Sequence, residues 1–403
     1  MQRESKSLMY LLILTLTLSA LFLFYFYYFP DNTIPDNTIC SFSLENMDEY
    51  DADAPLIKYT GRFDFKEGNT AIFSQSGSVI SWSFSGKNCI IRLRNYSTDP
   101  KNYSSNYFYV FVDDNDPIVL HATNDSDLYY LTGLGKGQHY LRLYKRTESA
   151  CGKCEFYGFY IDKNEDVYPM SDYLKLKIEF VGNSITAGYG NEDSLGGRRF
   201  RPEFENHYYS YAAFCARELF AEYHSVCFSG KGVYRNYDLS EKEVLPALYL
   251  RTYHQKNMKW DFSKWQPDIV VLNAGTNDFA QGIPPRDSFI ISYFHFLQTI
   301  RKKNSNAAIV VIDGPLLKNG LKTDTLDGSQ EQTYSIYKYC LNQAINNFRN
   351  AGNGNIFQFS LTPVGKLGYG TNWHPSKAQH EFNGKELADF IKKEVLLMND
   401  PPE

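Results

Sequence analysis

The sequence predicts an all-β domain followed by a parallel α/β domain, with a membrane-spanning helix ahead of both. Short apolar and aromatic runs separated by turn residues fill residues 54–165. Strand-like runs alternate with helix-like stretches over residues 172–398, and residues 8–29 contain no charged side chain. A chain of 403 residues is long enough for two domains.

The first segment, residues 1–30, is expected to be a targeting element. Arg3 and Lys6 precede the uncharged residues 8–29, a run of 22 residues that can cross a bilayer as a helix. The apolar core of a cleaved signal is usually shorter, about 7–15 residues, so we expect an uncleaved signal anchor. Cleavage after Ala20 is the alternative, and it would give a secreted protein. The positive charges place the rest of the chain on the lumenal or extracellular side.

Two features of the chain after this segment fit that side of the membrane. Residues 31–53 are polar and are expected to form a stalk. Three Asn-x-Ser triplets begin at Asn95, Asn102 and Asn124. Such triplets are acceptors for N-linked glycosylation, so a glycoprotein is expected.

The seven cysteines leave at least one thiol unpaired within the chain. Cys151 and Cys154 form a C-x-x-C motif, for which a structural disulfide or two plain thiols is favoured over half of a zinc site. No second C-x-x-C motif or spaced pair of histidines completes a zinc site, so no metal is expected.

Composition also excludes some partners. The net charge of −5 at pH 7 is mildly negative, whereas domains that bind nucleic acid are usually basic. We therefore expect no nucleic-acid partner.

The region of residues 54–165 is predicted to be a β-sandwich or barrel, because many short strands are separated by turn signals. Residues 78–84 alternate between polar and apolar side chains, as a half-buried strand does. The expected strands are residues 57–65, 71–74, 79–84, 89–93, 107–112, 118–121, 129–131, 140–144 and 156–161.

The region of residues 172–398 is predicted to be a parallel sheet covered by helices on both faces. The expected strands are residues 174–181, 225–228, 269–272, 308–312 and 356–359, and the expected helices are residues 208–223, 289–302, 331–350 and 385–397. Functional sites of such sheets lie beyond the carboxyl ends of the strands. Four polar motifs lie at those ends or just before the last helix.

Two of these motifs suggest a nucleophile and its base. Ser184 ends the tripeptide Gly-Asn-Ser directly after the first strand of the domain, where a tight turn exposes it. His374 lies late in the chain, in the run Asn-Trp-His-Pro. A serine nucleophile needs a base within hydrogen-bond reach, and the parallel topology can bring His374 to Ser184. Each residue alone also fits an ordinary role, such as a helix cap for the serine.

The other two motifs suggest hydrogen-bond donors for a developing oxyanion. Gly230 follows the strand at 225–228 in the run Ser-Gly-Lys-Gly, where the backbone can approach a ligand closely. Asn277 follows the strand at 269–272 and offers a side-chain amide. Together with the N–H of Ser184 they could form an oxyanion hole, although Gly230 alone also fits a simple turn.

The four motifs, in this order, resemble the SGNH hydrolase family, which is named for its Ser, Gly, Asn and His. The resemblance covers residue 172 to the C-terminus. It implies that Ser184 is the nucleophile and His374 the general base. It also implies that Gly230, Asn277 and the Ser184 N–H form the oxyanion hole.

A β-sandwich ahead of such a domain resembles carbohydrate esterase family two, whose members deacetylate sugars and polysaccharides. The resemblance rests on short segments such as Glu205-Asn206, Ser-Gly-Lys-Gly at Gly230 and Trp373-His374-Pro. It implies a jelly-roll sandwich joined to a three-layer α/β/α, flavodoxin-like domain. It also implies acetylated carbohydrate as substrate and no cofactor, with Trp373, Glu205 and Asn206 as candidate substrate contacts.

One position departs from the SGNH pattern. The family usually carries Asp three residues before the histidine, where this chain has Thr371. The resemblance to carbohydrate esterase family two implies a Ser–His dyad in which a backbone carbonyl orients the base, although Glu205 could also approach the histidine. An O-acyltransferase that uses the same site, or a weakly catalytic glycan-binding protein, remains the alternative function.

Overall fold

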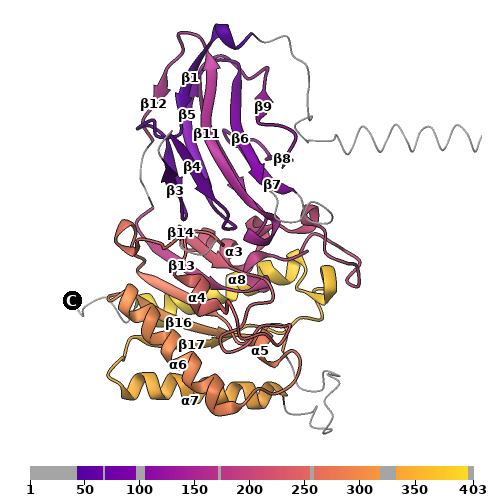
Figure 1. The fold of residues 1–403 in the computed structure, drawn as a ribbon, viewed down its shortest axis with the longest axis vertical. Coiled ribbons are helices and arrows are strands. Elements are labelled where there is room, and N and C mark those ends of the chain that lie inside the picture. The colour runs from indigo at the N-terminus through magenta and orange to yellow at the C-terminus, as the bar shows by residue number, and fades with distance from the viewer. Residues whose placement is uncertain are drawn as a thin grey trace, which may run out of the picture.

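Two domains lie end to end in the computed structural model, with the β-domain above and the α/β domain below in Figure 1. The structure describes residues 43–66, 69–96, 105–170, 174–254, 258–317 and 333–397. The expected membrane anchor at residues 1–30 lies outside these residues. None of the helices within these ranges is both long and apolar enough to span a membrane.

The first domain is a sandwich of two antiparallel sheets, each with six strands. One sheet has the order β3-β4-β11-β6-β9, with β1 also paired to β11, and the other has the order β12-β5-β10-β7-β8, with β2 also paired to β5. The strands of the first sheet are β1 (Met47–Asp51), β3 (Asp64–Lys66), β4 (Thr70–Phe73), β6 (Cys89–Tyr96), β9 (Leu128–Leu131) and β11 (Lys153–Asp162). Those of the second are β2 (Lys58–Thr60), β5 (Val79–Ser85), β7 (Asn106–Val112), β8 (Ile118–Ala122), β10 (Gln138–Lys145) and β12 (Val167–Tyr168).

Aromatic side chains fill the space between the two sheets. Ile80, Trp82 and Phe84 of β5 all belong to this core. The indole of Trp82 stacks on Phe159 of β11 with ring centroids 4.6 Å apart. The apolar residues of this strand face the core as the alternation predicts, but residues 80–85 are all buried, so the strand is not half-buried as expected. The serines between the core residues are also buried, and the Ser83 hydroxyl donates to the carbonyl of His139 over 2.9 Å and accepts from Gln138 Nε2 over 2.8 Å.

Part of the expected stalk belongs to the sandwich. β1 lies within residues 31–53 and pairs with β11 in the register Tyr50↔Phe159. The ring of Tyr50 also stacks on Phe159, with centroids 5.2 Å apart. The sequence did not predict this strand, because Met47 is its one buried residue and a single apolar position gives no strand pattern.

The predicted glycosylation sites differ in their accessibility. Asn95 is 2% exposed, its Nδ2 donates to Asn124 Oδ1 over 2.7 Å, and its Oδ1 accepts from Asn106 over 2.6 Å. The folded sandwich thus leaves no access to this amide. Asn124 is exposed, and Asn102 lies outside the described residues.

The cysteines that the structure describes are all buried free thiols. Of the two alternatives for Cys151 and Cys154, two plain thiols is therefore the one the structure shows. Cys40 lies outside the described residues.

The second domain is a five-stranded parallel sheet with the order β14-β13-β15-β16-β17. Counted within the domain this order is 2-1-3-4-5, the flavodoxin-like arrangement of a doubly wound sheet. The strands are β13 (Lys177–Gly182), β14 (Glu222–Cys227), β15 (Ile269–Asn273), β16 (Ala308–Asp313) and β17 (Ile356–Ser360). The α-helices are α2 (Ser184–Ala187), α3 (Tyr211–Glu218), α4 (Leu245–Tyr249), α5 (Thr276–Phe279), α6 (Arg286–Lys303), α7 (Thr333–Asn350) and α8 (Lys377–Phe390).

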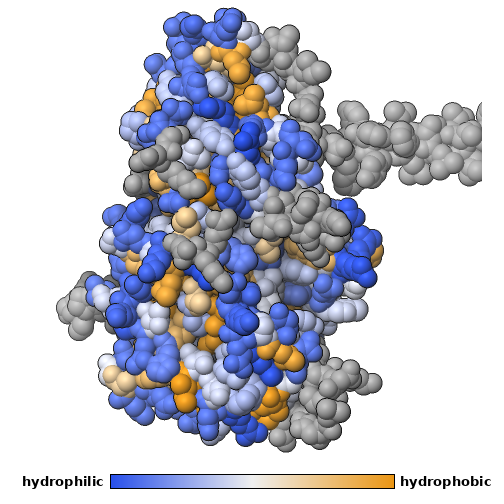
Figure 2. Space-filling view, in the orientation of Figure 1, coloured by the Kyte–Doolittle hydropathy of each residue, from blue (hydrophilic) through white to orange (hydrophobic). Residues whose placement is uncertain are grey.

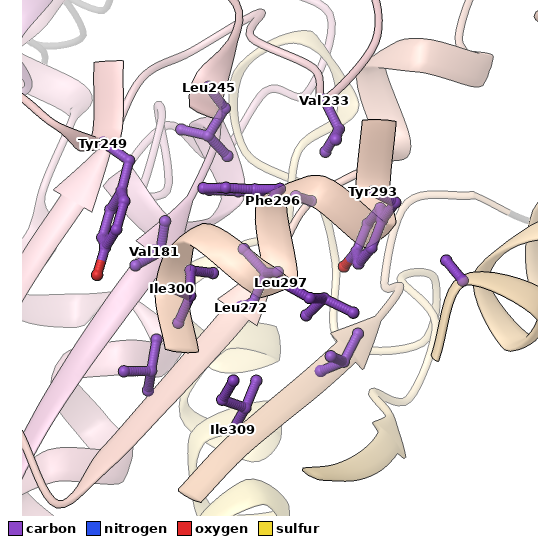
Figure 3. Close-up of a cluster of buried hydrophobic side chains, with 14 of the residues drawn as sticks. Val181, Val233, Leu245, Tyr249, Leu272, Tyr293, Phe296, Leu297, Ile300 and Ile309 are labelled. Atoms are coloured by element: carbon purple, nitrogen blue, oxygen red, sulfur yellow. The ribbon is translucent and has the colours of Figure 1, made fainter. Parts of the chain in front are cut away.

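Alternate residues of the buried strands point to opposite faces of this sheet. Val181, Leu272 and Ile309 pack with α4, α6 and α7 on one face, where Figure 3 shows them beside Phe296 and Ile300 of α6. The neighbouring strand residues pack with α3 and α8 on the other face. The three-layer arrangement follows from this alternation, because strands buried on both faces need helices on both.

Two helices differ from their predicted ranges. α3 ends at Glu218 and β14 already begins at Glu222, so the helix predicted to Tyr223 is shorter than expected. α8 begins at Lys377, eight residues before the expected start at Lys385. Ser376 sets this start, because its Oγ accepts the N–H of Gln379 over 3.2 Å.

A buried ion pair joins the two domains. The guanidinium of Arg62, from the sandwich, donates to Oε1 of Glu179 on β13 over 2.8 Å, and both side chains are almost fully buried. Arg62 also donates to the carbonyls of Tyr249 and Arg251 over 2.5 and 2.8 Å. The hydroxyl of Tyr249 donates to the second oxygen of Glu179 over 2.9 Å. Both charges are therefore compensated, as buried charges must be.

We expect Arg62→Met to lower the free energy of unfolding by about 3–5 kcal/mol, because it leaves the Glu179 carboxylate buried without its cation. The double variant with Glu179→Leu should recover part of this loss. Urea unfolding measures both values. Arg92→Met, which breaks an exposed pair with Glu49, is the matched control and should cost about 1 kcal/mol or less. Equal losses in the two single variants would contradict the importance of the buried pair.

Candidate active site

Ser184 lies at the carboxyl end of β13, as the first residue of α2. The side chain of Asn183 caps this short helix by accepting the N–H of Ile185 over 3.0 Å. Gly182 allows the tight turn, since a Cβ there would lie 2.1 Å from Thr186 Oγ1. The turn places Ser184 at the wall of a pocket.

The imidazole of His374 lies against this serine. Its Nε2 is 2.8 Å from Ser184 Oγ, and its Nδ1 lies 3.2 Å from the carbonyl oxygen of Thr371 and 3.3 Å from that of Asn372. Carbonyl oxygens only accept hydrogen bonds, so Nδ1 carries the ring proton. Nε2 of the neutral ring therefore has the lone pair free to accept the Ser184 proton.

The loop before His374 has a strained backbone. Asn372 and Trp373 have φ angles of 49° and 62°, in the left-handed region. Asn tolerates this region, whereas a bulky side chain such as Trp is seldom found there. The turn is fixed by the N–H of Trp373, which donates to Gly196 O over 2.9 Å. Strain of this kind often occurs at functional sites, and here it turns two carbonyls toward one imidazole.

The other predicted donors lie on the same pocket. Gly230, with φ 74°, and Asn277 both line it together with Ser184. Nδ2 of Asn277 donates to the carbonyl of Lys231 over 2.8 Å, so the two loops are tied to one another. The structure thus brings Ser184, Gly230, Asn277 and His374 together from four separate parts of the chain.

A buried carboxylate shapes the loop after Gly230. Asp278 is fully buried and accepts the backbone N–H groups of Val233, Tyr234 and Arg235 over 2.7–3.1 Å. Burial raises the pKa of Asp278 to about 6, against the lowering effect of these three donors.

A second carboxylate, from the sandwich, binds the residue that precedes Gly230. Oε2 of Glu148 accepts the N–H of Ser229 over 2.8 Å. The residue next to Gly230 is therefore anchored on the other domain.

The pocket has a volume of about 1050 Å³ and an aromatic wall. Tyr189, Tyr237, Tyr369 and Trp373 are among its lining residues. Trp373 is 61% exposed, so its ring is available to a ligand. Figure 2 shows the outer surface of one face, where hydrophobic residues lie in small groups among hydrophilic ones.

Two residues expected to contact substrate lie elsewhere. Glu205 and Asn206 are both fully buried, and neither lines the pocket. Oε2 of Glu205 accepts the N–H of Glu148 over 2.8 Å, and Nδ2 of Asn206 donates to the hydroxyl of Tyr109 over 2.9 Å. Both residues thus serve the contact between the domains, and Glu205 does not orient His374.

Tyr189 was not expected at the site. Its ring lies 4.5 Å from that of His374 between centroids and packs on Phe200 on another side. Its hydroxyl accepts from Nδ2 of Asn372 over 3.1 Å. Tyr189 lies five residues after Ser184, in a Gly-Tyr-Gly run, and this position was the sequence signal that could have identified it. Within the described ranges, no group of three or more His, Cys, Asp or Glu residues could hold a metal ion.

Comparison with known proteins identifies the family. Residues 59–170 match the Carbohydrate esterase 2 N-terminal family, and residues 180–382, half of the chain, match the GDSL-like Lipase/Acylhydrolase family. A solved family two carbohydrate esterase from Clostridium thermocellum, in complex with cellohexaose, is 30% identical with a TM-score of 0.76. The alignment covers 84% of this chain and 99% of that one. The chain belongs to the family two carbohydrate esterases.

The chain matches less than two thirds of the length of two curated relatives. The Cellulase/esterase CelE of Acetivibrio thermocellus is 32% identical over 355 residues, which are 87% of this chain and 41% of that protein. An acetylxylan esterase / glucomannan deacetylase of Cellvibrio japonicus is 28% identical over 221 residues, which are 52% of this chain and 61% of that protein.

The environment of His374 sets the protonation of its imidazole. Burial lowers the pKa of the imidazole to about 4, and the two carbonyl acceptors offset only part of this effect. The ring is therefore neutral, and able to accept a proton, over the whole physiological pH range.

We expect the His374 ring to stay neutral from pH 7 down to about pH 5 and to protonate near pH 4, because its pKa is lowered to about 4. Reactions that use Ser184 should keep their rate over that range and lose it toward pH 4. NMR titration of protein labelled with ¹⁵N-histidine measures the midpoint, and His374→Gln assigns the signals. A midpoint at the ordinary value of 6.5 would contradict the prediction.

Proposed function

We propose that the chain is a serine esterase that hydrolyses O-acetyl esters on carbohydrate. The observation that carries this proposal is the hydrogen bond of 2.8 Å between Ser184 Oγ and the neutral Nε2 of His374. A nucleophile, a base and two further donors on one open pocket are the parts that acyl transfer needs. Membership of the family two carbohydrate esterases supports carbohydrate as the substrate class.

The names of the relatives support the acetyl group. Two Cellvibrio japonicus relatives are each named acetylxylan esterase / glucomannan deacetylase. The exposed Trp373 at the pocket offers a flat apolar surface on which a sugar ring can stack. We therefore propose acetylated polysaccharide, or fragments of it, as the substrate.

In the first half of the reaction, Ser184 Oγ attacks the acetyl carbonyl carbon while His374 Nε2 takes the hydroxyl proton. The carbonyl oxygen becomes an oxyanion and is held by the N–H groups of Ser184 and Gly230 and by the Asn277 amide. The bond to the sugar oxygen then breaks. His374 gives its proton to that oxygen, and the sugar leaves as an alcohol.

In the second half, the acetyl group is an ester of Ser184 and water takes the place of the sugar. His374 Nε2 accepts a proton from the water as its oxygen bonds to the acetyl carbon. The tetrahedral intermediate collapses, His374 returns the proton to Ser184 Oγ, and acetic acid leaves and ionises to acetate in solution. The backbone carbonyls on Nδ1 keep the ring in one tautomer through both halves.

We further propose that the catalytic domains lie on the lumenal or extracellular side of a membrane, anchored by residues 8–29. The supporting observations are the uncharged run and the two positive charges before it. Asn124, the exposed acceptor, is the favoured glycosylation site among the described residues.

The reaction is tested by acetate release from acetylated xylan and from an aryl acetate. Ser184→Ala should remove activity, and Asn277→Ala should lower turnover by about 100- to 1000-fold, the usual cost of one oxyanion donor. Asn347→Ala, an exposed amide on α7, is the matched control. Acetate release that survives in Ser184→Ala would overturn the proposal.

The location is tested by expressing the full chain in a secretory host and extracting the membranes with carbonate. We expect the protein to remain in the membrane fraction, since a span of about 20 apolar residues inserts stably. Glycosidase treatment should lower its mass, and Asn124→Gln should remove part of that shift. A soluble product with unchanged mass would refute both proposals.

A further inference from the structure

The mechanism leaves unused one buried carboxylate, which lies one residue away from the base. Asp193 is 3% exposed. Its Oδ2 accepts the hydroxyl of Thr371 over 3.0 Å, and its Oδ1 accepts the N–H of Leu195 over 3.0 Å. No Lys, Arg or His forms an ion pair with it in the part of the chain that the structure describes.

Thr371 connects this carboxylate to the base. The threonine is fully buried, and its carbonyl oxygen lies 3.2 Å from Nδ1 of His374. The same oxygen accepts the backbone N–H of His374 over 3.1 Å. The position of Thr371 therefore decides whether the Nδ1 proton has its acceptor.

The loop that follows the nucleophile fixes Thr371 at two further atoms. Besides the Oγ1 bond to Asp193, the N–H of Thr371 donates to the carbonyl of Gly190 over 2.9 Å. The close approach requires glycine, because a Cβ at Gly190 would lie 2.2 Å from the Cβ of Thr371. The N–H of Asp193 also bonds to Gly190 O, over 3.2 Å, so both contacts come from one turn.

We propose that Asp193 is a positioning residue for the base, acting through Thr371. It holds the threonine so that the Thr371 carbonyl accepts the Nδ1 proton of His374. The carboxylate and the imidazole of a triad bond directly, whereas here one residue stands between them. The carboxylate thus contributes orientation without touching the ring.

The chemistry of the two bonds explains why this position carries an acid. The Thr371 hydroxyl and the Leu195 N–H both donate, so the side chain must accept twice. A carboxylate has two acceptor oxygens, whereas an amide has one acceptor and one donor. Asp193→Asn would therefore keep the shape but turn an amide NH2 group toward one of these two donors.

The test compares Thr371→Val and Asp193→Asn with Thr371→Ser, which keeps the hydroxyl. The ¹⁵N shifts of His374 report the fraction of the tautomer with the proton on Nδ1. The rate at which phenylmethylsulfonyl fluoride labels Ser184 reports its activation without any carbohydrate. Acetate release gives kcat and KM. Asp313→Asn, a buried carboxylate that accepts the hydroxyls of Tyr334 and Ser360, is the matched control.

We expect Thr371→Val and Asp193→Asn to mix the tautomers and to slow labelling and kcat by about 10- to 100-fold, by analogy with the loss found when the partner that orients a metal-ligating histidine is removed. KM should change by about 2-fold or less, because the pocket wall is untouched. Thr371→Ser and Asp313→Asn should behave as the wild type. The double variant should be no worse than either single one, since both act on the same contact.

A Thr371→Val protein with the wild-type tautomer and labelling rate would overturn the proposal. If Asp193→Asn unfolds, the comparison of Thr371→Val with Thr371→Ser still decides the matter. The inference rests on the proposed function only in taking His374 as the base. Absence of acetate release from the wild type would refute the substrate, whereas the tautomer and the labelling rate would still test Asp193.

Discussion

The Nδ1 proton of His374 needs an acceptor on the protein, and much of the site is arranged to provide one. The acceptors are backbone carbonyls of Thr371 and Asn372. A carbonyl orients the ring as a carboxylate does, but it brings no full charge to stabilise the imidazolium. With burial unopposed by an anion, the pKa of His374 falls to about 4. The base is therefore always free to act at neutral pH but is weaker than one beside a carboxylate, so more of the rate enhancement must come from the oxyanion hole.

The β-sandwich supports this active site by contacts with the strand and loops that carry its residues. It contacts the first strand of the α/β sheet through Arg62 and Glu179. Its Arg146 pairs with Glu192 in the loop after the nucleophile, and its Glu148 holds Ser229 beside Gly230. Because these contacts reach the loops of the nucleophile and of an oxyanion donor, a shift between the domains would disturb the geometry at Ser184.

The sequence predicted the strands and the four polar motifs because both depend on local patterns. Apolar alternation identifies strands such as β13 and β15, and residue type identifies Ser184 and Asn277. The acceptor of His374 could not be assigned by residue type, since any residue has a backbone carbonyl. Glu205 was misplaced for the opposite reason. Its carboxylate is of a functional residue type, but packing between the domains buries it. The residues next to Glu205 in the sequence give no indication of this packing.

The spacing of nucleophile and base follows from the loop of residues 188–193 rather than from the sheet alone. Ser184 and His374 are far apart in sequence, and the parallel strands bring them only to the same edge. The final alignment comes from short-range contacts: Gly190 and Asp193 bond Thr371, and Asn191 O accepts the N–H of Lys377 at the start of α8. This loop begins four residues after Ser184, so the same stretch of backbone fixes the positions of the nucleophile and of the base. A hydrogen bond weakens when its length changes by a few tenths of an ångström. Because few rotatable bonds separate Ser184 from the loop that holds Thr371, the distance between Ser184 and His374 varies little. Glycine at position 190 is therefore required for the catalytic geometry, because a side chain there would displace Thr371.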